Sequence, residues 1–362
     1  MESRRILFEK LGSVSNPNSM HGIYPYRGKI SALDAKNIIK QFESGKTLLD
    51  PFCGSGTIVY EGLAQGLNTI GVDNNPLAVT IAKAKIYRGA QQSIIDEATK
   101  FINDAKEDLK SNNFEQMPAV PLAQFHVNTA KEIMCLKNYY EEMNDFLKGI
   151  FYGTIALVAR GCNNYVWTSS TVGKPQEIKR YINFFEKFED KLNKHKNYLL
   201  NNHTNSANVI LGDSRKLSDF IPLKSIDYIF TSPPYFDGLD YTAYYGKLIY
   251  DIFGVNRQSI QKTLIQHIDN YREDMKLVLD EIDKITTDNA LVIFVVGDKK
   301  IKGTVVNGGD FFSEIKKASY VEERSYSGSQ SKVFDAINKT DRKEQIVVWD
   351  KQGGKIVEYE RR

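Results

Sequence analysis

The fold of this chain is decided by Leu48-Leu-Asp-Pro-Phe-Cys-Gly-Ser-Gly-Thr57. The apolar start of this stretch predicts a short strand, and the helical spacing of the residues behind it predicts a helix over 58–66. Gly54 and Gly56 allow positive φ and leave room for a ligand to approach the backbone. The helix N-terminus presents free N–H groups, so the stretch predicts a ligand site at the end of a strand.

Two common nucleotide-binding loops do not fit this stretch. A dinucleotide fingerprint needs a third glycine, and a Walker loop needs Gly-Lys-Ser/Thr; neither is present. A generic tight turn is the remaining alternative, but it would not explain the two glycines together with Asp50. That carboxylate stands at the end of the strand and can accept a hydrogen bond from an ammonium or a hydroxyl group.

A second apolar strand, predicted over 68–72, ends in Asp73. An acid at this place, about 20 residues after a Gly-rich loop, is where Rossmann-like folds hold ribose hydroxyls. Asn75 and Pro76 begin a predicted helix that continues to Lys85. An isolated acid at a strand end is usually a helix cap, but the spacing from the loop favours ribose. A third apolar strand, over 208–211, leads to Asp213, which can accept from an adenine amino group.

The fourth predicted strand, over 226–230, runs into Thr231-Ser-Pro-Pro-Tyr235. Proline lacks an N–H and fixes φ, so the two prolines end the strand in a stiff turn at the carboxyl edge of the sheet. Open α/β sheets bind ligands at that edge. A rigid turn with the hydroxyl of Ser232, free carbonyls and the ring of Tyr235 suits a flat base that carries an amino group. The alternative is a plain strand terminator with a rim aromatic.

Further strands are predicted over 290–297, 321–326 and 345–349, the last two as an antiparallel edge pair, with helices over 240–253, 271–285 and 309–318. Strands that alternate with helices predict an α/β fold with a mainly parallel sheet and helices on both faces. A largely helical insert, with helices over 93–110, 129–159 and 175–200, separates the second strand from the third. The predicted organisation is therefore a catalytic domain in two parts, 1–88 and 206–362, around an insert at 89–205.

The four motifs together resemble one family. The order Asp-Pro-Phe-Cys-Gly-Ser-Gly-Thr, Gly-Val-Asp-Asn-Asn-Pro, Gly-Asp-Ser, Thr-Ser-Pro-Pro-Tyr is similar to that of the S-adenosylmethionine-dependent DNA amino-methyltransferases, which produce N4-methylcytosine or N6-methyladenine. Residues 20–29 are similar to the segment that, in these enzymes, closes over the methionine end of the cofactor. The resemblance covers roughly 20–90 and 205–350. It implies a Rossmann-like class I methyltransferase fold with a seven-stranded sheet.

The resemblance also implies a cofactor, S-adenosyl-L-methionine, and a set of site residues, with no metal among the ligands. The residues expected to bind the cofactor are Tyr26, Lys29, Asp50, Phe52, Gly54, Ser55, Gly56, Thr57, Asp73, Asn74, Asp213 and Ser214. The residues expected to act in catalysis are Ser232, Pro233, Pro234 and Tyr235.

In that family the residue that opens the Pro-Pro-Tyr turn accepts from the target amine. Asp is common there in adenine enzymes and Ser in N4-cytosine enzymes, so Ser232 favours cytosine N4, with adenine N6 as the alternative. A carbonyl of the turn, expected to be that of Pro233, accepts a hydrogen bond from the second N–H of the amine, so that the nitrogen lone pair can attack the sulfonium methyl. Flipping the base out of the duplex costs on the order of a few kcal/mol. Stacking on Tyr235 is expected to offset part of this cost.

The chain has three scattered cysteines, Cys53, Cys135 and Cys162, and their positions argue against a cysteine nucleophile, a disulfide framework and a zinc site. None follows a proline, as the nucleophile of a carbon-5 cytosine methyltransferase usually does. Their spacing fits neither a disulfide framework nor a zinc site, which predicts a reducing compartment. No apolar run is long enough to span a membrane, and residues 1–5 lack the apolar region of a signal peptide. We therefore expect a cytoplasmic protein, prokaryotic or phage-encoded.

The net charge of the chain is only +3, so any charge that binds DNA must be local. The insert holds a polar, aromatic and basic loop at 160–174 and a lysine-rich helix behind it. Basic residues contact phosphates, whereas polar and aromatic residues read or stack bases. One hypothesis is that the insert recognises the target; an equally weighted alternative is a solvated helical cap, because acidic residues dilute the charge. The nucleic-acid-binding residues expected under the first are Arg160, Tyr165, Trp167 and Lys174.

Three functional classes remain open. The first is a methyltransferase acting on double-stranded DNA in a restriction-modification or defence system, with a cognate restriction endonuclease as a possible partner. The second is an RNA amino-methyltransferase on the same fold, and the third is a non-catalytic nucleic-acid-binding subunit. Because both the cofactor motifs and the base motif are intact, the third class is disfavoured. No separate RNA-binding module is recognisable, which disfavours the second.

Overall fold

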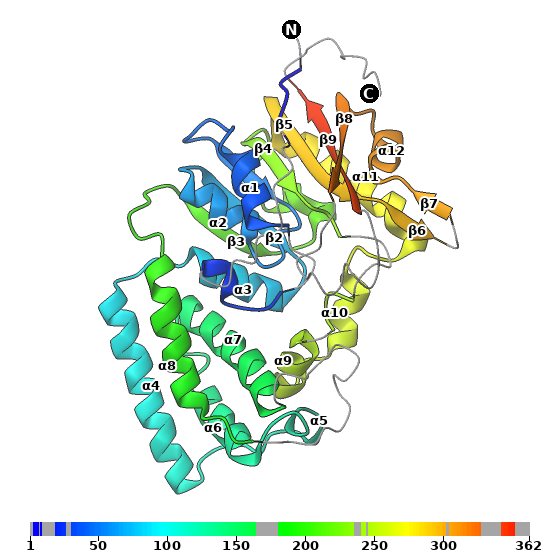
Figure 1. Ribbon diagram of the computed structural model, residues 1–362. Helices are drawn as coiled ribbons and strands as arrows, with labels where there is room; N and C mark the ends of the chain where they lie inside the picture. Colours follow the sequence, from blue (N-terminus) through cyan, green and yellow to red (C-terminus); the bar gives the residue numbers. More distant parts are fainter. Residues whose placement is uncertain are drawn as a thin grey trace.

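The computed structural model describes residues 3–6, 8, 19–26, 30–163, 180–234, 240–243, 245–301, 304–326 and 342–351. These residues form a sheet flanked by helices and a separate helical lobe (Figure 1). Among them, no helix combines the length and hydropathy needed to cross a membrane.

The main sheet has seven strands in the order β3-β2-β1-β4-β5-β9-β8. Its strands are β1 (Thr47–Asp50), β2 (Asn68–Asp73), β3 (Ala207–Leu211), β4 (Ile226–Thr231), β5 (Thr286–Gly297), β8 (Tyr320–Tyr326) and β9 (Arg342–Asp350). The first five are parallel, and β9 runs antiparallel between β5 and β8. This confirms the predicted class I, Rossmann-like sheet. The strand order reverses between β1 and β4, which is where folds of this kind bind ligands.

Both faces of the sheet are covered at its central strands, which explains why β1, β4 and β5 contain continuous apolar runs. Leu49 and Ile229 point to the face covered by α11 (Ile268–Ile285) and α12 (Gly308–Ile315). Leu48 and Phe230, one residue away along each strand, point to the face covered by α1 (Ala32–Ile39) and α2 (Thr57–Ala64). Successive residues of a strand face opposite sides, so each strand contributes to two cores.

The helical lobe lies below the sheet in Figure 1 and shares one core with α3 (Pro76–Ile86). Its helices are α4 (Gln91–Ser111), α5 (Ala119–Leu122), α6 (Val127–Lys137), α7 (Asp145–Cys162) and α8 (Phe184–His195), and α9 (Tyr245–Phe253) packs against them. The remaining elements are η1 (Met20–Gly22), η3 (Lys196–Tyr198), η4 (Ser214–Asp219), α10 (Arg257–Thr263) and the hairpin of β6 (Lys299–Ile301) and β7 (Thr304–Val306).

Three predicted helix boundaries were wrong because side chains cap or break the helices. The single helix predicted over 129–159 is two, α6 and α7, because the side chain of Asn144 accepts from the N–H of Leu147 and begins a new helix. The helix predicted over 175–200 is not helical at 180–183, and α8 begins after Asn183, which caps it in the same way. The carboxylate of Asp240 accepts from the N–H of Thr242, so a turn precedes α9.

Candidate functional site

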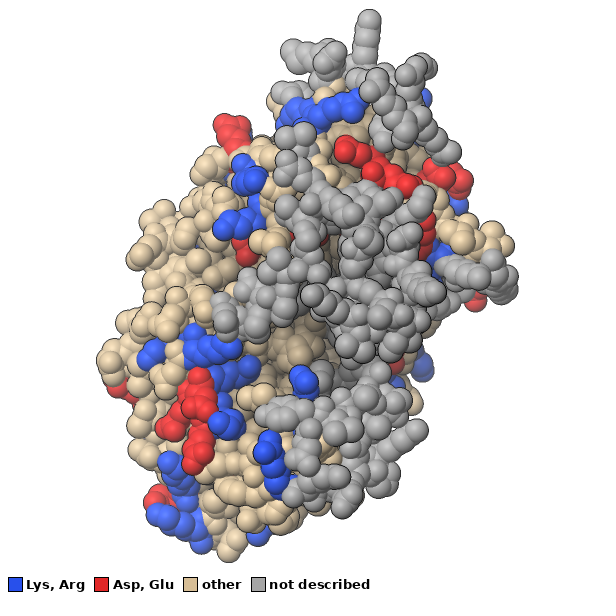
Figure 2. All heavy atoms as spheres, viewed as in Figure 1, with Lys and Arg blue, Asp and Glu red and all other residues tan. Residues whose placement is uncertain are grey.

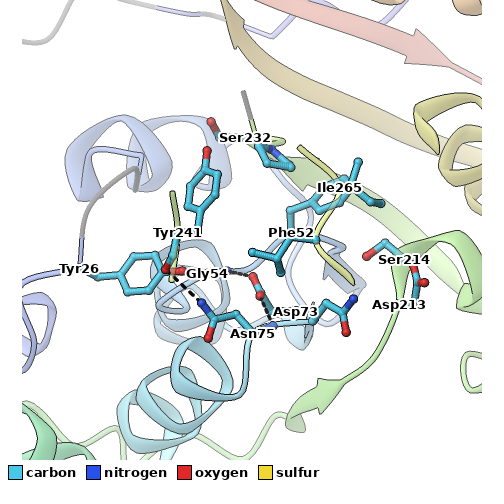
Figure 3. Close-up of a pocket in the computed structure, with 13 residues that line it drawn as sticks. Tyr26, Phe52, Gly54, Asp73, Asn75, Asp213, Ser214, Ser232, Tyr241 and Ile265 are labelled. Carbon is cyan, nitrogen blue, oxygen red and sulfur yellow. Dashed lines mark hydrogen bonds between the residues drawn. The ribbon is translucent and has the colours of Figure 1, made fainter. Parts of the chain in front are cut away.

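A pocket opens at the carboxyl ends of the strands, beside the point where the strand order reverses (Figure 3). Loops that follow β1, β2, β3 and β4 all contribute to it, together with the N-terminal segment and residues around α10. The lining residues are Tyr26, Phe52, Gly54, Asp73, Asn74, Asn75, Asp213, Ser214, Ser232, Pro234, Tyr241, Leu264 and Ile265. The predicted cofactor motifs and the predicted base motif thus share one cavity.

Asp73 joins the Gly-rich loop to the second strand. Its Oδ2 accepts from the N–H of Gly54 at 2.8 Å, and its Oδ1 accepts from the N–H of Asn75 at 2.8 Å (Figure 3). Burial raises the pKa of the carboxyl to about 6, although the backbone N–H donors oppose this rise. Each carboxylate oxygen can accept a second hydrogen bond, so Asp73 retains capacity for ribose hydroxyls.

The Gly-rich loop needs a glycine at position 54. Gly54 has φ +48°, and an added Cβ would lie 3.3 Å from Cε1 of Tyr26. The Tyr26 ring therefore rests on the loop at the edge of the pocket (Figure 3). The structure thus brings the segment predicted to close over the cofactor to the predicted loop.

The next three residues of the loop do not line the pocket. Ser55 is buried and accepts from Lys85 Nζ at 3.3 Å, and Thr57 is buried as well. Gly56 has φ +73°, as expected, but an added Cβ would lie 2.8 Å from Cβ of Ala82 on α3. The space at Gly56 is therefore taken by a neighbouring helix and not by a ligand. This corrects the expectation that both glycines admit a ligand.

Asp50 is buried under the pocket and is absent from its lining. Its Oδ1 accepts from Thr231 Oγ1 at 2.6 Å, which ties the end of β1 to the end of β4, and from the N–H of Phe52 at 3.1 Å. Burial raises the pKa of Asp50 to about 7, opposed by these two hydrogen bonds, and the nearby charge of Asp73 raises it further. Asp50 therefore titrates close to neutral pH.

At the end of β3, the carboxylate of Asp213 is already paired. It accepts from Nε of Arg215 at 2.9 Å and from Nη2 at 2.7 Å, and Arg215 also pairs with Asp274. Burial alone would raise the pKa of Asp213, but its hydrogen bonds and ion pair with Arg215 hold the pKa below its usual value. Ser214 donates to the carbonyl of Pro51. Both residues line the pocket, so Asp213 reaches the predicted place as one member of an ion pair.

The turn after β4 is held from outside by a residue that sequence reasoning missed. The hydroxyl of Tyr271, on α11, donates to the carbonyl of Pro234 at 2.6 Å. Tyr271 is only 3% exposed, and its ring packs against Phe311 and Phe312. Ser232 and Pro234 line the pocket, and Pro233 is buried beside them. The turn is thus stiffened by its prolines and also by a partly buried hydrogen bond.

Asn75 and Tyr241 also shape the pocket. Nδ2 of Asn75 donates to the carbonyl of Tyr241 at 3.2 Å, and Oδ1 of Asn75 caps α3 (Figure 3). The side chain of Tyr241 lines the pocket as well. Leu264 and Ile265, which follow α10, line the pocket too, and no local motif announces them.

Five of the expected site residues lie outside the described part of the chain: Lys29, Tyr165, Trp167, Lys174 and Tyr235. Arg160 is half-buried near the end of α7 and does not line the pocket. The expected nucleic-acid-binding role of the insert therefore stays a prediction.

The chain matches one protein family over residues 28–295, well over half of its length. That family is described as the D12 class of N6 adenine-specific DNA methyltransferases. The chain belongs to this family. S-adenosyl-L-methionine is accordingly its cofactor, and the pocket suits that molecule, because an acid at the end of β2 meets a Gly-rich loop there.

Two curated relatives match shorter stretches of the chain. Type II methyltransferase M.MjaII of Methanocaldococcus jannaschii is 31% identical over 107 residues, which is 29% of this chain and 20% of that protein. Type II methyltransferase M.MvaI of Kocuria varians is 58% identical over 40 residues, or 11% and 9% of the two chains. The matches thus span a fifth or less of either relative.

The likeness of this chain to solved structures is weak. The rRNA methyltransferase aviRa from Streptomyces viridochromogenes aligns over 90% of this chain and 87% of its own, with 12% identity and a TM-score of 0.32. A SAM-dependent methyltransferase from Agrobacterium tumefaciens aligns over 89% and 61%, with the same identity and TM-score. A likeness this weak supports no conclusion about substrate.

Proposed function

We propose that this protein transfers a methyl group from S-adenosyl-L-methionine to the N6 amine of adenine in double-stranded DNA. The observation that carries the proposal is the single pocket that joins the acid of β2 to the stiff Ser-Pro-Pro turn of β4. The family match supports DNA and adenine as the substrate. The curated relatives are Type II methyltransferases, which supports a restriction-modification or defence setting with a cognate endonuclease.

The proposed target base is adenine and not cytosine, which the sequence had favoured. The preference for cytosine N4 depended on one residue, Ser232, whose hydroxyl can accept from the amine of either base. The family match covers most of the catalytic domain and names adenine N6. It therefore outweighs a single hydroxyl, and the cytosine preference is not supported.

Several residues of the pocket are suited to hold the cofactor. Asp73 would accept from the ribose hydroxyls, Gly54 leaves the loop backbone open, and Phe52, Ile265 and Tyr26 supply apolar surface. When bound, S-adenosylmethionine supplies an electrophilic sulfonium methyl group. Ser55, Gly56 and Thr57 support the loop from behind and are proposed to act on its shape alone.

The turn after β4 is proposed to orient the target amine. An aryl amine is a poor nucleophile because its lone pair is delocalised into the ring. Two acceptors, Ser232 Oγ and the carbonyl of Pro233, would each accept a hydrogen bond from one N–H of the amine and pull the nitrogen towards tetrahedral geometry. The hydroxyl of Tyr271 donates to the carbonyl of Pro234 and so fixes the turn that carries these acceptors. The gain in rate comes from orientation and preorganised dipoles, and no strong base is required.

The helical insert is proposed to contact DNA, which would bring phosphate-binding charge next to the pocket. On the face shown in Figure 2, basic side chains gather over the insert with acidic ones among them. Some are already paired, as Lys187 is with Asp190 and Lys110 with Glu107. The mixed charge fits modest phosphate contact, with the base itself flipped into the pocket.

The function is tested by incubating the full chain with tritiated S-adenosylmethionine and either unmethylated plasmid DNA or bulk RNA. Label is expected in DNA, and Pro234→Ala should abolish the transfer while it spares most of the cofactor binding. Label in RNA alone, or full transfer by Pro234→Ala, would contradict the proposal.

A further inference from the structure

A short N-terminal segment, residues 19–26, lies between the helical insert and the cofactor pocket; we call it the strap. Three of its side chains, Met20, Ile23 and Tyr24, are buried in the core of the insert. The strap ends at Tyr26, whose ring lines the pocket and contacts Gly54. A displacement of the strap would therefore move a wall of the pocket.

On the catalytic side, a buried polar chain holds the strap. Nε2 of His21 lies 2.8 Å from Glu61 Oε1 on α2, and Nδ1 of His21 lies 3.3 Å from Lys85 Nζ on α3. Lys85 also donates to Ser55 in the Gly-rich loop. His21 is 4% exposed and Lys85 1%, so these contacts form away from water, where polar groups need partners. The strap and the cofactor loop are thus tied to the same buried lysine.

On the insert side, two helices contact the strap backbone directly. Lys191, on α8, donates from Nζ to the carbonyl of Gly22 at 3.4 Å. At Gly153, in the middle of α7, an added Cβ would lie 1.9 Å from the carbonyl oxygen of Ile23. A glycine inside a helix costs about 1 kcal/mol relative to alanine, so its presence here indicates a packing need. The strap occupies the space that a side chain of α7 would take.

We propose that the helical insert positions Tyr26 over the cofactor loop through the strap, with Lys191 and Gly153 as positioning residues. Only three residues lie between Gly22, whose carbonyl the insert holds, and Tyr26, whose ring lines the pocket. Affinity for the cofactor then depends on the insert as well as on the catalytic domain. A ligand that binds the insert and shifts the strap would therefore change the affinity for the cofactor. By thermodynamic linkage, the cofactor would change the affinity for that ligand by the same factor.

The inference rests on the proposed function only in taking the pocket as the cofactor site. It is tested by a double-mutant cycle on the full chain, in which isothermal titration calorimetry measures the dissociation constant of S-adenosylmethionine. Lys191→Met is expected to weaken binding about fivefold, the value of one hydrogen bond. Tyr26→Ala is expected to weaken binding as well. The double variant should bind no more weakly than Tyr26→Ala, because Lys191 acts through Tyr26.

Lys194→Met, an exposed position on the same helix, is the matched control and should leave the dissociation constant unchanged. Gly153→Ala is a second test, because its added methyl group must displace the strap. It should weaken cofactor binding in the wild-type background and have no further effect on binding in the Tyr26→Ala background. Additive effects in both cycles, or unchanged binding by Tyr26→Ala, would overturn the inference. Absence of cofactor binding by the wild type would instead overturn the cofactor assignment itself.

Discussion

The hydrogen bond from Tyr271 to the catalytic turn can be tested by removing one oxygen atom. Tyr271→Phe keeps the ring against Phe311 and Phe312 but deletes the hydroxyl that lies 2.6 Å from the carbonyl of Pro234. A neutral hydrogen bond contributes about 0.5–1.5 kcal/mol, and about 1.4 kcal/mol corresponds to a factor of ten. We expect kcat for methyl transfer to fall roughly threefold to tenfold. The dissociation constant of S-adenosylmethionine should stay the same, because Tyr271 does not line the pocket.

The assay is single-turnover transfer of a tritiated methyl group to saturating plasmid DNA, with cofactor binding measured separately. Tyr228→Phe is the control. Tyr228 lies on β4, the strand that leads into the turn, and its hydroxyl accepts from the N–H of Glu43, away from the turn. The control should lose a similar amount of stability with no change in kcat. If Tyr271→Phe transfers at the wild-type rate, or loses rate only through weaker cofactor binding, the reasoning about the turn is refuted.

Three other variants test residues that line or support the pocket. Asp73→Asn should weaken cofactor binding about 10- to 150-fold, the value of one hydrogen bond to a charged group. Calorimetry should show that the wild-type affinity for the cofactor rises as the pH passes through about 6, whereas the affinity of the variant does not change with pH. Unchanged affinity, or a similar loss in Asp227→Asn at the far end of β4, would argue against this role. The pKa of Asp50 is raised from 3.8 to about 7, so the folded protein binds this proton more tightly than the unfolded chain does. The proton therefore stabilises the fold fully below about pH 4, and this contribution to the free energy of unfolding is lost as the pH rises to about 7. In urea titrations Asp50→Asn should therefore gain up to roughly 4 kcal/mol over the wild type between pH 4 and 7, and a constant difference would contradict the raised pKa. Gly56→Ala should lower the free energy of unfolding by roughly 2–5 kcal/mol, because it adds left-handed backbone strain and a clash with α3. Gly45→Ala is the control, because Gly45 has positive φ but open space around it, and it should show the strain alone. Equal losses of stability in the two variants would mean that position 56 does not require close packing.

The strands and the pocket acids could be predicted because their signals are local. Leu48 and Leu49, like Ile229 and Phe230, face opposite cores, so a short continuous apolar run marks each central strand. Asp73 could be found from its distance to the Gly-rich loop, since the unit of strand, helix and strand has a nearly fixed length.

The remaining features depend on contacts that local patterns do not contain. Tyr271 stands 37 residues after Pro234 in the sequence, on a helix whose apolar spacing only indicates burial. Whether Ser55 faces the ligand or the interior depends on Lys85 of α3, and the space at Gly56 depends on Ala82. The break between α6 and α7 was missed because Tyr140 and Met143 are buried and continue the apolar pattern through it.

The most direct test of the account is the identity of the methylated nucleoside. Unmethylated plasmid DNA is incubated with the full chain and S-adenosylmethionine, digested to nucleosides, and analysed by liquid chromatography and mass spectrometry. The account predicts N6-methyladenine, which Ser232→Ala should reduce. N4-methylcytosine as the product would contradict the assignment of adenine and restore the interpretation of Ser232 as a cytosine signal.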